Sequence, residues 1–189
     1  HRPAHWDIYY GRARAAKPVH STPINLDCPV IEVNWWNAYA YCKWRSKIEN
    51  TTIELPTEAE WEIAAHAGKN TVYPWGNEFD PKMANSNVDY QQADPGAKGK
   101  VDGYNFWNPV DEKEEDKSPF GVIGMAGNVA EWTGTWTPDN RYPIIKGGRF
   151  MCAGDRLARR RAGVDPGAIR GNIGFRIIRR TPPPGWTKE

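Results

Sequence analysis

Apolar residues recur with helical spacing over residues 35–47, directly after a residue that suits a helix start. The side chain of Asn34 can accept a hydrogen bond from a backbone amide of the first turn. Arg45 and Lys47 lie near the far end, where the helix dipole favours positive charge. The pattern therefore predicts a helix over residues 35–47, with one face toward the core.

A second helix start follows at residues 57–60, which read TEAE. In such a capping box, Thr57 accepts from a backbone amide of the first turn and Glu60 reaches back to the helix start. Gly68 can end the helix, because glycine readily adopts the left-handed conformation that follows a last turn. The sequence thus predicts two main helices, the second ending near residue 67.

The second half of the chain shows short runs typical of strands. In the last run, Ile173, Phe175 and Ile177 alternate with Arg176, as in a strand that is buried on one face. The predicted strands cover residues 131–136, 144–150, 158–162 and 174–179.

The remaining segments are predicted to be irregular. Residues 1–28 form an irregular N-terminal segment, and residues 181–189 form a proline-rich tail that cannot pair in a sheet. Residues 73–132 are predicted to be long loops, and the charged run at 111–117 a solvated part of them. A compact domain with so much loop needs a further stabilising element, and the Asn and Asp content makes a bound metal a candidate.

Composition agrees with a single loop-rich domain. The 189 residues include 10 Trp, 8 Tyr, 18 Gly and 16 Pro, with a mean hydropathy of −0.74. A net charge of +2 gives no reason to expect nucleic acid, and no apolar run approaches the length of a membrane span. The chain begins with His1 rather than methionine, and such a processed N-terminus favours an extracytoplasmic location.

The chain has three cysteines, Cys28, Cys42 and Cys152. An odd number allows at most one disulfide, and no CxxC spacing suggests a zinc site. Cys42 lies within the first predicted helix among aromatic residues, so a buried thiol is expected there.

Seven short motifs occur along the chain, and their order identifies a family. One such motif would be weak evidence, whereas seven in order are strong. The motifs are VNW (33–35), LPTEAEWE (55–62), YPWGN (73–77), AN (84–85), GNVAEW (127–132), KGG (146–148) and IGFR (173–176). Together they resemble the formylglycine-generating enzyme family, also called sulfatase-modifying factor domains. The resemblance implies an α+β fold, a loop-rich variant of the C-type lectin fold with short mixed sheets, over residues 29–180.

The resemblance also implies that the catalytic centre is incomplete. The family's enzymes bind copper(I) through two cysteine thiolates, which are soft ligands suited to this ion. Cys152 matches the first cysteine, whereas Leu157 replaces the second, Arg149 a serine and Ala153 a histidine. We therefore expect no copper and a non-catalytic binding or structural module within a larger assembly. The alternative is a copper-dependent formylglycine-generating oxidase with Cys152 as its reactive thiol and Cys28 as a distant second ligand.

Calcium is the cofactor that the resemblance does imply. The side chains of Asn85 and Asp102 and the carbonyls of Ser86 and Tyr104 match the family's calcium ligands. Calcium prefers six to eight oxygen ligands, and carboxylate, amide and carbonyl groups from two loops provide them. The alternative interpretation is a pair of turn residues that cap their own backbone.

A second, less complete calcium set follows from the same resemblance. Gly127, Val129 and Glu131 are present, but Gly124 stands where the family usually has Asn or Asp. Without a metal, Glu131 would bond to backbone amides of its own loop.

Charged residues near Cys152 are candidates for ligand binding. The arginines near Cys152 can bind an anion or an acidic partner through charge-assisted hydrogen bonds. A third functional class, the hypervariable ligand-binding proteins of this fold, varies the stretch that corresponds to residues 149–172. The candidate binding residues are Arg149, Asp155, Arg156 and Arg159.

A missing strand is the last implication of the resemblance. The family usually has a further strand and helix before the part that matches here, and that strand pairs near the IGFR strand. An unpaired sheet edge invites a partner. We therefore expect a missing N-terminal segment or another protein chain to complete the sheet at residues 174–179.

Overall fold

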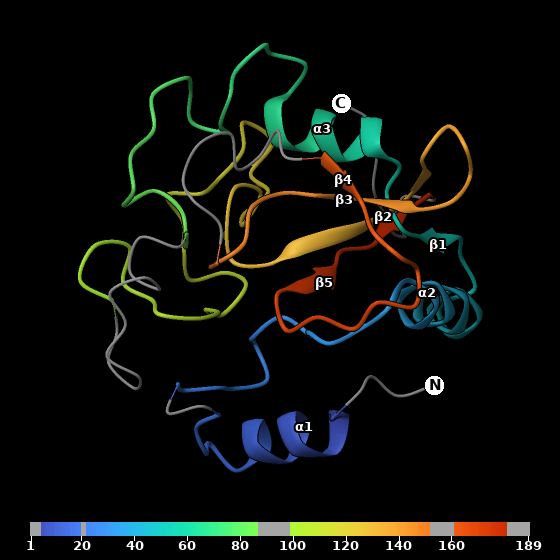
Figure 1. The fold of residues 1–189 in the computed structure, drawn as a ribbon, viewed down its shortest axis with the longest axis horizontal. Coiled ribbons are helices and arrows are strands. Elements are labelled where there is room, and N and C mark those ends of the chain that lie inside the picture. The colour runs from blue at the N-terminus through green and yellow to red at the C-terminus, as the bar shows by residue number, and fades with distance from the viewer. Residues whose placement is uncertain (1–4, 20–21, 87–98, 152–160, 181–189) are drawn as a thin grey trace.

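The computed structural model describes residues 5–19, 22–86, 99–151 and 161–180. Within these ranges it contains three helices, α1 (Trp6–Arg14), α2 (Trp35–Glu49) and α3 (Glu58–His66) (Figure 1). The strands are β1 (Ile53–Glu54), β2 (Ala130–Trp136), β3 (Pro143–Lys146), β4 (Arg161–Gly163), β5 (Ile173–Phe175) and β6 (Ile178–Arg179).

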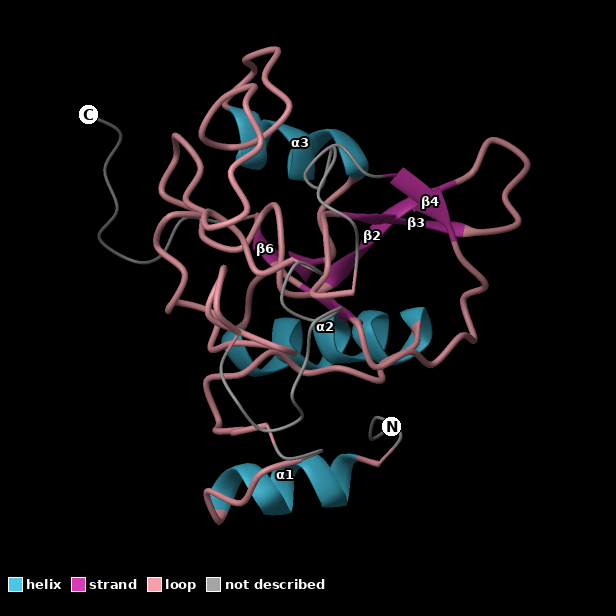
Figure 2. Ribbon diagram, turned by 60° about the vertical axis from the view of Figure 1, so that its left-hand side comes forward, coloured by secondary structure: helices cyan, strands magenta, loops and turns pink. Residues whose placement is uncertain are grey.

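The strands form two short sheets, as predicted for an α+β fold. The larger sheet has the order β4-β3-β2-β5, in which β2 pairs antiparallel with β3 and parallel with β5. The smaller sheet pairs β1 with β6 antiparallel. Helices α3 and α2 lie on opposite sides of the larger sheet, and α1 lies beyond α2 (Figures 1 and 2).

Both predicted helix starts are confirmed. The Asn34 side chain accepts from the Asn37 backbone N–H at 2.9 Å, and the Asn37 side chain accepts from the Asn34 backbone in return. Thr57 and Glu60 form the same reciprocal arrangement at the start of α3. The left-handed conformation begins at Ala67, one residue before Gly68, so α3 ends at His66. None of the described helices is long and apolar enough to cross a bilayer.

The prediction of an irregular N-terminal segment was wrong over residues 6–14, which form α1. The two predicted main helices are present as α2 and α3, so α1 is a third helix of the described chain. Helix α1 has no buried residue of its own, which is why its pattern gave no signal. Contacts far along the chain hold it, since the Tyr9 ring meets Trp107 edge-on at 6.2 Å and His5 bonds to Glu32 at 2.6 Å.

The bounds of the predicted strands needed correction. Residues 174–179 are two strands, because the chain leaves the larger sheet after Phe175 and pairs with β1 from Ile178. Strand β3 ends at Lys146 rather than residue 150, because Gly147 adopts a φ of 79°. Strand β2 begins at Ala130, and of the predicted strand at 158–162 only the part from Arg161 is described.

The core lies between α2 and the larger sheet. Trp132 is fully buried there with Ala38, Cys42 and Ile173. The Trp132 indole N–H donates to the Val33 carbonyl at 2.9 Å, which ties the segment before α2 to β2. A buried indole needs such an acceptor, because an unpaired donor is costly in the core.

The long loop prediction is confirmed for the described residues between 73 and 129, which contain neither helix nor strand. The interior of these loops is polar. The charged run at 111–117 is only partly solvated, because Lys113 and Asp116 are buried. The other buried polar residues of the loops are Asn85, Ser86, Asp102, Asn105, Asn108, Ser118 and Asn128.

Candidate functional site

The four residues of the first predicted calcium set lie together beneath the long loops. The Ser86 backbone N–H donates to Asp102 Oδ2 at 2.8 Å, and the Tyr104 N–H donates to Asp102 Oδ1 at 2.9 Å. Asn85, Ser86 and Asp102 are buried. One carboxylate thus joins two loop segments that are 16 residues apart.

An oxygen in this cluster is available for a cation. Asn85 Nδ2 donates to the Phe106 carbonyl and to Asn108 Oδ1, at 2.6 and 2.7 Å. Asn85 Oδ1, in contrast, is buried and has no hydrogen-bond partner within the described structure, and neither has Ser86 Oγ. Burying an unpaired carbonyl-type oxygen costs free energy, about 1–3 kcal/mol, and a bound cation would remove that cost. The residues therefore fit calcium.

A lysine adds positive charge beside the same cluster. Lys113 Nζ donates to the Asp102 carbonyl at 3.1 Å, and its side chain is mostly buried. Glu115 Oε2 lies 3.9 Å from Lys113 Nζ and offsets part of this charge. Described residues contain no group of three His, Cys, Asp or Glu side chains suited to a metal, so a cation here would depend on the single Asp102 carboxylate together with amide and carbonyl oxygens.

In the second predicted calcium set, the carboxylate of Glu131 is surrounded by side-chain hydrogen-bond donors. Glu131 is buried, and Trp61 Nε1 donates to its Oε2 at 2.6 Å. Arg176 donates from Nε to the same oxygen at 2.5 Å and from Nη2 to Oε1 at 2.7 Å. The alternative expected for Glu131, bonding to backbone amides of its own loop, is replaced by side-chain donors from α3 and from the residue after β5.

Most residues of the predicted copper and ligand-binding region lie outside the described residues. This applies to Cys152, Asp155, Arg156, Leu157 and Arg159. Arg149 is described, and its Nη1 donates to Asn172 Oδ1 at 3.4 Å.

The two described cysteines carry free thiols. Cys42 is buried as predicted, and burial raises its pKa to about 11. Cys28 is half-buried, and burial likewise raises its thiol pKa. Raised pKa values leave little reactive thiolate near neutral pH.

A large groove opens between α2, the end of β5 and the loops around residues 26–33 and 121–131. Its volume is about 1550 Å³. Tyr41 and Trp44 of α2 form one wall and are 37% and 53% exposed, and Leu26 and Val30 line another part. Sequence reasoning missed this groove because it assigned α2 a single core face. The available signal was a second group of apolar residues on α2, at positions 40, 41 and 44.

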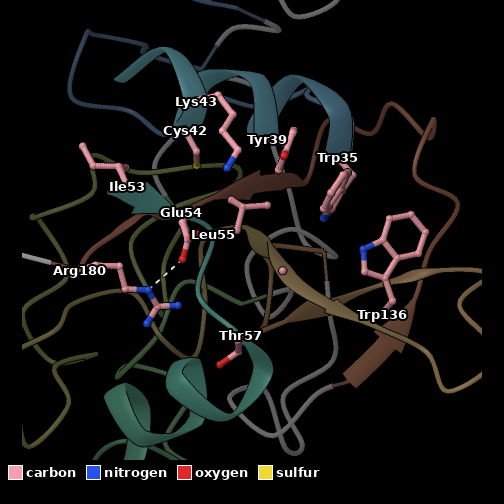
Figure 3. A pocket seen from close by; sticks show the side chains of 11 residues that line it. Trp35, Tyr39, Cys42, Lys43, Ile53, Glu54, Leu55, Thr57, Trp136 and Arg180 are labelled. Atoms are coloured by element: carbon pink, nitrogen blue, oxygen red, sulfur yellow. Dashed lines mark hydrogen bonds and ion pairs between the residues drawn. The ribbon is translucent and has the colours of Figure 1, made fainter. Parts of the chain in front are cut away.

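A smaller cavity of about 260 Å³ lies between α2, β1 and the end of β2 (Figure 3). Its wall is aromatic, since the Trp35 ring stacks on Tyr39 with centroids 5.1 Å apart and Trp136 meets Trp35 edge-on. Arg180 Nε donates to Glu54 Oε2 at 2.9 Å, and the Arg180 guanidinium also bonds to Glu60.

The charged side chains at this cavity are therefore largely paired with one another. The hydrogen bond from Arg180 lowers the pKa of Glu60 to about 2. This cavity is the less suitable of the two for a partner, because its guanidinium already has two carboxylates.

Comparison with known proteins identifies the family of the chain. The family profile of the sulfatase-modifying factor enzyme 1-like domain matches residues 9–181. Inactive C-alpha-formylglycine-generating enzyme 2 of Bos taurus is 36% identical over 160 residues, covering 80% of this chain and 50% of that protein. Formylglycine-generating enzyme of Bos taurus is 32% identical over 170 residues, covering 79% of this chain and 43% of that protein.

A solved structure shows the same fold. PvdO from Pseudomonas aeruginosa matches with a TM-score of 0.64 and 26% identity, covering 80% of this chain and 61% of that chain. The present chain spans about half the length of the curated relatives that it matches. From the family match over most of its length and the shared fold, the chain belongs to the family of sulfatase-modifying factor, or formylglycine-generating enzyme-like, domains.

Proposed function

We propose that this domain is a non-catalytic module that binds an extended polypeptide segment in the groove between α2 and β5. The observation that carries the proposal is an apolar groove with exposed aromatic side chains beside the terminal strand of a sheet. Tyr41, Trp44 and Ile177 are all more than a third exposed there. Large apolar side chains gathered at one concave surface are typical of an interaction site.

The sheet edge supplies the polar part of such a site. In the described sheet, β5 pairs only with β2, so its other edge faces away from the sheet. Backbone N–H groups alternate between the two edges of a strand, and the Ala130 N–H donates to the Asn172 carbonyl. The amide of Phe175 therefore faces the outer edge. An added strand would bond to this edge, as in β-augmentation.

Aromatic residues of the groove supply the apolar part. Full burial of a large apolar side chain contributes roughly 1.5–3 kcal/mol. Trp44 is half exposed, so a bound segment has a large area left to cover. Tryptophan and tyrosine are also the residues that most often dominate binding energy at interfaces.

The proposal that the domain is non-catalytic rests on the missing second thiolate. Leu157 stands where the family's enzymes have a copper-ligating cysteine, and an alkyl side chain without sulfur cannot bind copper(I). The relative named as inactive is 36% identical to this chain, which supports the same interpretation. Mass spectrometry of a sulfatase-type cysteine peptide, incubated with the chain, copper and oxygen, should show no conversion to formylglycine. Conversion that disappears in Cys152→Ser would establish the oxidase alternative.

We also propose that one calcium ion binds at Asn85 and Asp102, with the carbonyls of Ser86 and Tyr104. Support comes from the buried, unpaired Asn85 Oδ1, because the next residue, Ser86, donates its backbone N–H to the Asp102 carboxylate. A site that exists only in the folded state stabilises the fold by about 2.7 kcal/mol at a hundredfold excess over Kd. For a chain of this size, a chelator should then lower the Tm by roughly 5–10 °C.

Calorimetry with and without chelator tests the calcium proposal. Asp102→Ala should remove the effect of the chelator, whereas Asp139→Ala, a change at an exposed turn, should leave it intact. A wild-type Tm that does not respond to chelator would show that no calcium ion stabilises the fold.

Self-association tests the groove. By sedimentation velocity, the 189-residue chain should associate as its concentration rises, because no strand of the described residues pairs with the outer edge of β5. Trp44→Ser should reduce this association at least tenfold, since about 1.4 kcal/mol corresponds to a factor of ten. Trp36 is the matched control: it lies on the same helix, is also 53% exposed, and does not line the groove.

The bound segment can come from the same polypeptide or from another protein, and sedimentation velocity distinguishes the two. If the strand belongs to the same polypeptide, the product of the gene's full reading frame should be monomeric. If it belongs to another protein, that product should still associate until the partner is present. A wild-type chain that stays monomeric at all concentrations, with no effect of Trp44→Ser, would contradict the proposed function.

A further inference from the structure

One row of residues on α2 lines the smaller cavity. Trp35, Tyr39 and Lys43 follow one another at every fourth position, so they lie along one side of the helix, and all three line the cavity (Figure 3). Tyr39 is 41% exposed, and Lys43 is exposed as well. The side chains of Tyr41 and Trp44 line the groove instead. The cavity is therefore a second accessible surface of α2, separate from the groove.

The wall of this cavity contains three aromatic rings. The ring centroids of Tyr39 and Trp35 are 5.1 Å apart, and those of Trp35 and Trp136 are also 5.1 Å apart. A polyproline II helix rises about 3.1 Å per residue with three residues per turn, so one turn is roughly 9 Å long. The three rings together cover at most about the length of one such turn. Aromatic-lined surfaces are where proline-rich segments dock on proteins.

Two hydrogen-bond donors at the cavity have no acceptor within the described part of the chain. One is Trp136 Nε1, and the nitrogen edge of this ring is turned toward the other lining residues in Figure 3. The other is Lys43 Nζ, which lies 5.0 Å from the centre of the Tyr39 ring. An indole N–H and an ammonium group can donate but cannot accept. The cavity therefore suits a ligand that offers acceptors.

The charges at the cavity favour a ligand without net charge. Arg180 is paired with Glu54 and Glu60, so an anion would have to compete with two carboxylates. A cation near Tyr39 would be repelled by Lys43. A proline-rich segment is neutral and apolar in its rings, and its backbone carbonyls are acceptors. Proline also has no backbone N–H that would need an acceptor in return.

We propose that the smaller cavity binds a proline-rich segment of a partner polypeptide in the polyproline II conformation. The proline rings pack against Tyr39, Trp35 and Trp136, and backbone carbonyls of the segment accept from Trp136 Nε1 and Lys43 Nζ. The cavity volume of about 260 Å³ limits the contact to a few residues, since sites for drug-sized ligands have about 300–1,000 Å³. This site does not depend on the groove, because a run of prolines lacks the N–H groups that strand addition at β5 requires.

Octaproline is the probe for the first test. It is titrated into a dilute, isotopically labelled sample of the 189-residue chain while NMR follows the indole N–H signals. The signal of Trp136, identified by its absence from Trp136→Phe, should shift in a saturable manner. Tyr39→Ala should raise the Kd at least about tenfold, because it removes part of the aromatic wall.

Tyr41→Ala is the matched control. Tyr41 lies on the same helix and is 37% exposed, but it lines the groove and not the cavity. This variant should bind octaproline almost as well as the wild type. No saturable shift in the wild type, or equal losses of affinity in the two tyrosine variants, would refute the inference.

The role of the donors is tested by Lys43→Met, which keeps the length of the side chain but removes the ammonium group. The Kd for octaproline should rise roughly three- to tenfold, as expected for the loss of one hydrogen bond. Methyl β-D-glucoside, a neutral ring that also carries hydroxyl donors, should not shift the Trp136 signal. A saturable shift with the glucoside and none with octaproline would overturn the assignment of the ligand.

The source of the segment is tested within the chain itself, because residues 182–184 are also prolines. Replacing all three (Pro182→Ser, Pro183→Ser and Pro184→Ser) should leave the Kd for octaproline unchanged if the natural segment belongs to a partner. A gain in affinity of about tenfold or more would show that the chain's own tail competes for the cavity, and would refute an external partner.

Discussion

Helix α2 has two apolar faces that differ in what covers them. Trp35, Ala38 and Cys42 are buried against the larger sheet. Tyr41 and Trp44 line the groove and are among the more exposed large apolar residues of the described chain. A helix that packs one apolar face on the core normally presents polar residues on its other faces. The difference indicates that one face belongs to the finished core and the other to a binding surface.

Truncating the core face should have the largest effect on stability. Trp35 is nearly buried, donates from Nε1 to the Thr133 carbonyl at 2.9 Å and contacts Trp136. Trp35→Ala should therefore destabilise the fold by about 3–5 kcal/mol, through a cavity and an unpaired carbonyl. Urea unfolding followed by circular dichroism measures this loss. A loss below about 1 kcal/mol would mean that this face is not the core.

The thiols of the core and of the groove should differ in reactivity. Cys42 belongs to the core face and Cys28 to the groove wall, while the pKa values of both are raised by burial. In a Cys152→Ser background at pH 8, a thiol reagent should label Cys28 at least about tenfold faster, because Cys42 is 1% exposed and burial raises its thiol pKa to about 11, whereas Cys28 is half-buried. Equal rates at the two cysteines would show that Cys42 is as accessible as Cys28.

Truncating the groove face should have the smallest effect on stability. Trp44 is half exposed and its ring contacts only Tyr41 among the described aromatic residues, at 5.5 Å. Trp44→Ser should change the free energy of unfolding by no more than about 0.5–1 kcal/mol. The same urea experiment measures it under dilute, monomeric conditions. A loss comparable to that of Trp35→Ala would assign Trp44 to the core and remove the contrast between the faces.

Local signals in the sequence were sufficient for α2 and α3. Each capping box lies within a few residues of its helix, so short-range chemistry specifies both starts. The fold class followed from the order of the motifs, and the family match agrees with it. The burial of Cys42 was also predictable, because the residue lies on the core face of an aromatic helix.

Long-range contacts account for what the sequence did not indicate. Helix α1 depends on Trp107 and Glu32, and β6 depends on pairing with β1, which lies far earlier in the chain. The ion pair between Arg176 and Glu131 could not be predicted from the sequence either, because the two residues lie 45 positions apart. The calcium residues were found through the resemblance, and the structure brings Ser86 and Asp102 together, but the ion itself stays a prediction.

Hydrogen exchange at the outer edge of β5 tests the central claim most directly. In a dilute, monomeric sample of the 189-residue chain, the amide of Phe175 should exchange quickly, because no described strand pairs with that edge. In the full gene product or its assembly, the same amide should be strongly protected by the added strand. Strong protection of Phe175 already in the monomeric chain would mean that the sheet is complete without a bound segment, and would contradict the proposed function.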